Sequence, residues 1–183
     1  MDALELLLSR RSNKKLVAPA PQGEQLDNIL QAALHAPDHG RLTPYRFVII
    51  EKQGQDVLEQ LLQSAVEELN LGEERKKKAT DVSHRAPMII AVIAKINNEI
   101  GKVPGWEQML TAGCATYAMQ LAANAQGFDN VWVSGPWIDG TELRQAFGCE
   151  AQDKVIALLM LGTAEQKLEK AKIHDVSPYV SYL

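Results

Sequence analysis

A long helix followed by a short strand is predicted by the stretch "GCATYAMQLAANAQGFDNVWVSG", residues Gly113–Gly135. Its first part belongs to an alanine-rich helical window, Glu107–Gln126. Gly127 supplies a stop, because glycine readily adopts the backbone conformation that ends helices. Asn130–Gly135 then reads as a strand that runs into a loop. A helix whose side chains are small and apolar all round is expected to be central and buried, with a second subunit as one surface that could cover it.

Apolar runs on both sides of this unit predict the rest of a sheet. Pro87–Lys95 ("PMIIAVIAK") and Lys154–Gly162 ("KVIALLMLG") are uninterrupted, which is typical of strands covered on both faces. Arg46–Glu51 is dense in β-branched and aromatic residues and also reads as a strand. The last residues, Ser177–Leu183, are expected to add an extended edge segment.

Helical spacing of apolar residues predicts further helices, at Ala3–Leu8 with Asp2 as its cap, Glu24–Leu34 ended by Pro37, Gln55–Leu69 and Thr141–Phe147. Helices and strands alternate without a clean repeat, and no biased linker divides the chain. We therefore expect one domain over residues 1–183, of class α+β or three-layer α/β, with a central sheet covered by helices.

Composition excludes several classes of protein. The net charge is −4, whereas a nucleic-acid-binding protein usually carries a basic excess. The one basic run, Arg75–Lys78, follows acidic residues and reads as a solvated helix face. No apolar run approaches the roughly 20 residues that span a bilayer, and the N-terminus lacks the features of a signal peptide. We expect a cytoplasmic protein without membrane or nucleic-acid partners.

Three short segments carry polar groups that suit ligand binding. Ser9–Lys15 ("SRRSNKK") offers arginines and a serine to phosphate oxygens, or simply completes a helix C-terminus. His35–Phe47 ("HAPDHGRLTPYRF") offers His35, Asp38 and His39 to a metal, although its arginines oppose a cation; anion binding or a polar turn are the alternatives. Val131–Gly135 leaves backbone donors at a strand end, while its Trp132 is typical of a core residue.

Motifs for the commonest catalytic chemistries are missing. The chain has no GxGxxG after a strand, no P-loop and no GxSxG. Its two cysteines, Cys114 and Cys149, form no CxxC and lie in apolar stretches. They are expected to be buried thiols, with a single disulfide as the alternative, rather than activated nucleophiles or metal ligands.

The order of these segments resembles the nitroreductase family, in its small branch of NAD(P)H nitroreductases. The resemblance is carried by "RRSNKK", "APDHGRLTPYRF", "KVPGWEQ", the quoted helix–strand unit and "LLMLGTA", and it covers essentially the whole chain. It implies an α+β sandwich with a mainly antiparallel sheet, in an intertwined homodimer that binds FMN in two pockets at the subunit interface.

The same resemblance implies site residues and a reaction. Flavin-binding roles fall on Arg10, Arg11, Ser12, His35, His39, Trp132, Val133 and Ser134, with the two histidines reaching the flavin of the other subunit. A segment assigned to NAD(P) in similar proteins corresponds to Ala122, Ala123, Asn124, Ala125, Gln126 and Gly127. FMN would carry electrons from NADH or NADPH to a nitroaromatic, quinone or similar small acceptor by a ping-pong mechanism, so no catalytic side chain is required.

Some positions depart from the family pattern. Val133 stands where related sequences often have a basic residue, His35 where arginine is also seen, Tyr45 for a tryptophan and Ala164 for a proline. These departures predict a weaker flavin site. The departures at Val133 and Tyr45 keep open a flavin-binding carrier or sensor without efficient turnover. Two further alternatives are a flavin dehydrogenase for a specific metabolite, since the fold hosts several chemistries, and a metal-dependent hydrolase that uses His35, Asp38 and His39.

Overall fold

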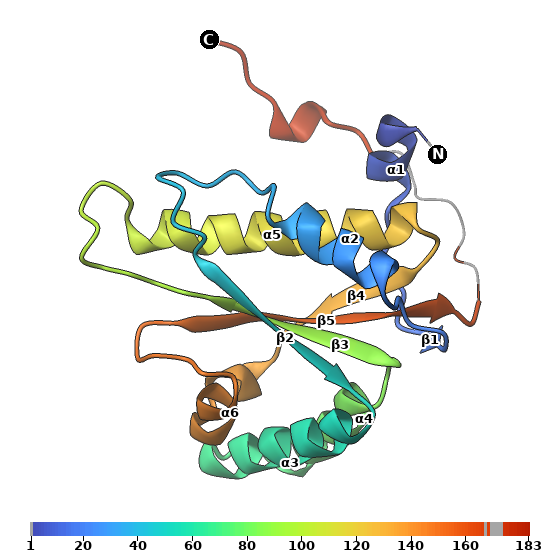
Figure 1. Ribbon diagram of the computed structural model, residues 1–183, viewed down its shortest axis with the longest axis vertical. Helices are drawn as coiled ribbons and strands as arrows, with labels where there is room; N and C mark the ends of the chain where they lie inside the picture. Colours follow the sequence, from blue (N-terminus) through green and yellow to red (C-terminus); the bar gives the residue numbers. More distant parts are fainter. Residues whose placement is uncertain (1, 167, 169–173) are drawn as a thin grey trace.

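An antiparallel sheet of five strands forms the centre of the protein (Figure 1). The computed structural model describes residues 2–166, 168 and 174–183. The long last strand, β5, pairs with three others, and β2 completes the sheet beside β3. The strands are β1 (Leu16–Val17), β2 (Tyr45–Glu51), β3 (Met88–Ala94), β4 (Asp129–Val133) and β5 (Lys154–Ala164).

Residues of the central strands alternate between two hydrophobic cores, because successive side chains point to opposite faces. On β3, Ile89, Ala91 and Ile93 enter one core, and Met88, Ile90 and Val92 enter the other. All seven residues of this strand are buried. The uninterrupted apolar run therefore predicted its two-sided burial correctly.

Helices cover both faces of the sheet, and this confirms the three-layer α/β/α arrangement of the α+β class (Figure 1). One layer holds α2 (Glu24–Ala33) and α5 (Gly105–Ala125). The opposite layer holds α3 (Gln53–Glu68), α4 (Glu73–Ser83), α6 (Thr141–Ala146) and the 3₁₀ turn η1 (Pro136–Asp139). The basic run lies on α4, where Lys77 and Lys78 are exposed to solvent as expected.

Helix ends follow the local signals. Asp2 caps α1 (Ala3–Ser9), with its carboxylate accepting from the backbone N–H of Leu4 at 2.8 Å. Gly127 ends α5 with a φ of 86°, the conformation that glycine adopts most easily. The two-residue strand β1 was not anticipated, because so short a segment carries no periodic signal.

The expected edge segment at Ser177–Leu183 is wrong. These residues contain a 3₁₀ turn, η2 (Ser177–Tyr179), in which Asp175 accepts the N–H of Ser177 at 3.0 Å. The segment lies beyond the helical layer, where the edges of the sheet are out of its reach (Figure 1). Strand-like composition cannot form a strand without a neighbour to pair with.

Apolar side chains gather on the outer side of the α5 layer. The helix α1 buries none of its residues and exposes Leu4, Leu7 and Leu8. The expectation that α5 is buried all round holds for its inner side only, since Trp106 and Leu110 are 60% exposed. Among the residues that the structure describes, no helix combines the length and apolarity needed to cross a membrane.

Candidate functional site

A groove of about 550 Å³ runs along the outer side of α5. Residues at helical spacing from α5 form its floor, β4 contributes an aromatic ring, and the segment after α2 closes one side. Its lining is almost entirely apolar and consists of His35, Ala36, Pro37, Leu110, Gly113, Cys114, Tyr117, Ala118, Leu121 and Trp132. A volume of about 300–1,000 Å³ with an apolar lining is typical of small-molecule sites.

Trp132 is a wall of this groove rather than a core residue. Its indole N–H donates to the backbone carbonyl of Ile156 at 2.9 Å, which fixes the orientation of the ring. The far edge of the ring lies 4.0 Å from the position that a Cβ on Gly113 would take. With 37% of the residue exposed, the indole presents one side to the groove. The expectation of a core tryptophan is therefore corrected.

Arg10 meets the groove at Tyr117. Its guanidinium carbon lies 6.0 Å from the centre of the Tyr117 ring, at the outer limit of a cation–π contact. Arg10 itself is half-buried at the end of α1, while Arg11 and Ser12 are exposed. Two of the segments singled out in the sequence, the arginine run and the strand end at Trp132, are thus brought to one groove.

A buried asparagine, which sequence reasoning did not select, holds the arginine run in place. Asn13 donates from its side chain to the Asp129 carboxylate at 2.7 Å and from its backbone to the Asn130 carbonyl at 2.9 Å. The Asn130 side chain in turn exchanges hydrogen bonds with Gln120 on α5, at 2.8 and 3.0 Å. The only available signal was its place in a polar run, where an exposed side chain is the usual outcome.

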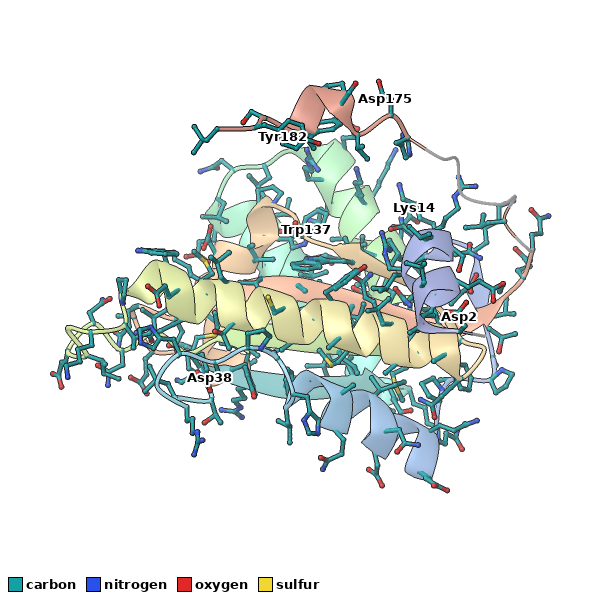
Figure 2. All side chains as sticks on the ribbon, turned by 90° about the horizontal axis from the view of Figure 1, so that it is seen from above. Asp2, Lys14, Asp38, Trp137, Asp175 and Tyr182 are labelled. Carbon is teal, nitrogen blue, oxygen red and sulfur yellow. The ribbon has the colours of Figure 1, made fainter. Side chains whose placement is uncertain are left out.

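The loop after α2 is ordered by its own aspartate. The Asp38 carboxylate accepts the backbone N–H groups of Leu42 at 3.1 Å and Thr43 at 2.7 Å. Thr111 on α5 donates to the carbonyl of Pro37 at 3.0 Å, which ties the loop to the groove. Figure 2 looks down on α5 and shows Asp38 on the opposite side of this helix from Tyr182.

The two histidines of this loop take different positions. His35 lines the groove, whereas His39 pairs with Glu107 near the start of α5, its Nδ1 2.7 Å from a carboxylate oxygen. In the described part of the chain, no three His, Cys, Asp or Glu side chains stand close enough together to hold a metal ion. The metal-site interpretation of His35, Asp38 and His39 therefore lacks structural support.

The last segment assigned to flavin presents only its tryptophan to the groove. Val133 packs against the core between the sheet and α3, since it is one residue from Trp132 and points to the opposite face. Ser134 is exposed. A basic side chain at position 133 would point away from the groove, so the geometry does not support a weaker flavin site through the loss of a charge at Val133. A weaker flavin site as such stays a prediction.

The segment Ala122–Gly127 is engaged with the body of the protein. Ala123 is fully buried, and the Gln126 side chain donates to the carbonyl of Gln25 at 3.0 Å. Asn124 donates to the carbonyl of Phe128 at 2.9 Å. The groove lining ends just before this segment, at Leu121. Its assignment to NAD(P) stays a prediction.

A second cavity, of about 580 Å³ and largely polar, lies near the start of α5. Its buried Asp153 accepts hydrogen bonds from Lys95 Nζ and from the N–H groups of Glu150 and Ile96. Burial alone would raise the pKa of Asp153, but these hydrogen bonds outweigh it and lower the pKa. The carboxylate of Asp153 is thus satisfied by hydrogen bonds within the protein.

The cysteines differ from expectation. Cys114 is exposed in the groove, because it lies on the outer side of α5. Cys149 is half-buried, and burial raises the pKa of its thiol, with the nearby Arg144 opposing this effect. Both are free thiols. The raised pKa disfavours the thiolate form of Cys149, the form that acts as a nucleophile.

The architecture defines a class of proteins. The structure superposes on a nitroreductase-like family protein from Bacillus cereus with a TM-score of 0.84 and 19% identity, over 100% of this chain and 96% of that one. An FMN-dependent nitroreductase from Clostridium difficile gives a TM-score of 0.71 and 23% identity, over 98% of both chains. These likenesses establish the nitroreductase-like fold.

The sequence then decides the family. The chain belongs to the Nitroreductase family, a family of oxidoreductases, whose model matches residues 7–163. It is 59% identical to the "Putative NAD(P)H nitroreductase" of Haemophilus influenzae over the full length of both chains. It is 45% identical to the "Putative NAD(P)H nitroreductase YdjA" of Escherichia coli, again over both full lengths. The resemblance read from the motifs is confirmed.

Proposed function

We propose that this protein is a single-domain, FMN-dependent NAD(P)H oxidoreductase. The observation that carries the proposal is the meeting of Arg10, Tyr117 and Trp132 at one apolar groove. A flavin needs an apolar slot for its ring system and a cation for its phosphate, and the groove supplies both kinds of surface. The FMN-dependent nitroreductase of C. difficile shares the fold, and the relatives' names refer to NAD(P)H.

The residues of this chain would divide the work of holding FMN. Arg10, Arg11 and Ser12 would bind the phosphate, and Trp132 with the neighbouring backbone at Val133 and Ser134 would face the ring. His35 lies in the groove, and His39 would reach the flavin of a second subunit. When bound, FMN would take a hydride from NADH or NADPH and pass electrons to a nitroaromatic, quinone or similar acceptor, one substrate after the other.

A homodimer is part of the proposal. The leucines of α1 and the outer side of α5 are exposed, although isolated monomers rarely leave so much apolar surface in one region. A seven-residue helix that buries nothing is also too short to be stable without a partner surface. A second copy would cover both surfaces and complete the groove. A small-molecule electron acceptor, NADH or NADPH as the electron donor and the cytoplasmic location stay predictions.

The test is a spectrum followed by a reduction. The purified protein should show flavin absorbance, which NADH or NADPH should bleach without oxygen, and a nitroaromatic compound should restore it. A protein that binds FMN but is bleached by neither nucleotide would favour the carrier or sensor. A protein that binds no FMN would refute the proposal.

A further inference from the structure

We propose that Asn13 is a positioning residue for the phosphate of the flavin, an inference that rests on the proposed function. It would act through Arg10, Arg11 and Ser12 rather than by touching the cofactor. Its role would be to hold this segment at a set distance from the groove, so that the guanidinium groups are in place before the ligand arrives.

The environment of Asn13 is unusual for its place in the sequence. It is 2% exposed, although Ser12 and Lys14 on either side are exposed. Its side-chain N–H₂ donates to Asp129 at 2.7 Å and to the carbonyl of Gln166 at 3.3 Å. Its side-chain oxygen accepts the N–H of Lys15 at 3.0 Å. One side chain thus links the arginine run to the start of β4 and to the end of β5.

These contacts form a closed ring that includes Tyr117, a lining residue of the groove. Asn13 is joined to β4, where Asn130 is bonded to Gln120 of α5. Gln120 lies three residues after Tyr117, so both are on neighbouring turns of the same helix, and Arg10 lies over the Tyr117 ring. Arg10 is three residues before Asn13. The arginine is therefore held from two ends, by a buried amide and by an aromatic ring.

Such a ring of contacts favours binding of a phosphate because it lowers the conformational entropy that the arginine segment loses on binding. An arginine on a loose chain end loses conformational freedom when it binds an anion, and that loss weakens the complex. The buried asparagine fixes the position of this segment in advance and so removes part of this loss. A purely structural role would stabilise the fold without regard to which flavin is bound.

The experiment compares FMN with riboflavin, which has the same ring system but no phosphate. Both are titrated into full-length protein that has been stripped of flavin, and the ratio of the two Kd values reports the phosphate contribution. In Asn13→Ala, we expect the preference for FMN to fall by about tenfold or more, while riboflavin binding changes little. Val82→Ala, a buried change on α4 in the opposite layer, is the control that should keep the preference.

A matched pair at Asp129 separates the hydrogen bond from the charge. Asp129→Ala and Asp129→Asn remove the same negative charge, but only asparagine keeps an oxygen that can accept from Asn13. We expect the alanine variant to lose the preference for FMN and the asparagine variant to keep it. Because Asp129 is half-buried, these variants carry the test even if Asn13→Ala does not fold.

The outcomes are distinguishable. An unchanged preference in Asn13→Ala or in Asp129→Ala would overturn the positioning role, as would equal losses in the two Asp129 variants. A wild-type protein that binds no FMN would overturn the proposed function, and the inference with it.

Discussion

The buried amide pair between α5 and β4 makes a quantitative prediction about stability. Asn130 is fully buried and Gln120 is 4% exposed, so their hydrogen bonds at 2.8 and 3.0 Å are shielded from water. In Asn130→Ala, the Gln120 amide loses its acceptor, which costs about 1–3 kcal/mol for a buried donor. Loss of the second hydrogen bond adds about 1 kcal/mol. We expect a total loss of about 2–4 kcal/mol in the free energy of unfolding.

A double variant tests the reasoning more sharply than the single change. Once Gln120 is also alanine, no orphaned side-chain group remains, so the second substitution should add little. The loss of stability in the double variant should therefore be smaller than the sum of the losses in Asn130→Ala and Gln120→Ala, by about 1–3 kcal/mol. Urea unfolding measures Asn130→Ala, Gln120→Ala and the double variant. All are compared at one protein concentration, because the stability of the proposed dimer would depend on concentration.

Ser83→Ala is the matched control for a buried polar group. Its hydroxyl is also fully buried, but it donates only to the Ala79 carbonyl within its own helix, at 2.9 Å. We expect a loss below about 1 kcal/mol there. A loss of the same small size in Asn130→Ala, or full additivity in the double variant, would refute the account of the α5–β4 contact.

Other predictions concern the Asp153–Lys95 ion pair, the close packing at Gly135 and the orientation of Val133 at the end of β4. Because the pKa of Asp153 is lowered, its ionised carboxylate adds to the free energy of unfolding above about pH 4, and this stabilisation is lost as the pH falls further. We therefore expect Asp153→Asn to destabilise the protein at pH 7 and much less at pH 3, as measured by urea unfolding at each pH. Lys95→Met, which removes its main cationic donor, should show the same pH trend, and a pH-independent loss would contradict it. In Gly135→Ala, the new Cβ would lie 2.5 Å from the Trp137 ring, so we expect a loss of about 1–3 kcal/mol and weaker flavin binding; unchanged values of both would show that the strand end adapts freely. Val133→Arg should destabilise the protein without tightening FMN binding, because the side chain points into the core, and tighter binding in a titration would contradict this placement.

Local patterns predicted the elements and the layers because burial leaves a periodic trace in the chain. The unbroken apolar run at Met88–Ala94 requires cover on both faces, and the structure supplies it. The Asp2 cap and the Gly127 stop act within one turn of their own residues, so they too can be predicted from the local sequence alone. Segment order along the whole chain was enough to indicate the family, which the family model confirms.

Other features depend on partners that are distant in the sequence. The strand pattern at Ser177–Leu183 has no sheet edge within reach, and Cys114 is exposed because its side of α5 faces outward. Likewise, the single-residue step from Trp132 to Val133 sends one side chain to the groove and the other to the core. The face that each residue takes is set by strand pairing, not by its own type.

The sequence by itself determined the kind of fold, the family and the segments that meet at the candidate groove. Only the tertiary structure decided which residues of those segments meet. Asn13 contacts Asp129 across 116 positions of chain, and no local preference of asparagine foretells that partner. The tendency of an apolar residue to be buried follows from its own side chain. A buried hydrogen bond, by contrast, depends on two residues and on the fold that brings them together.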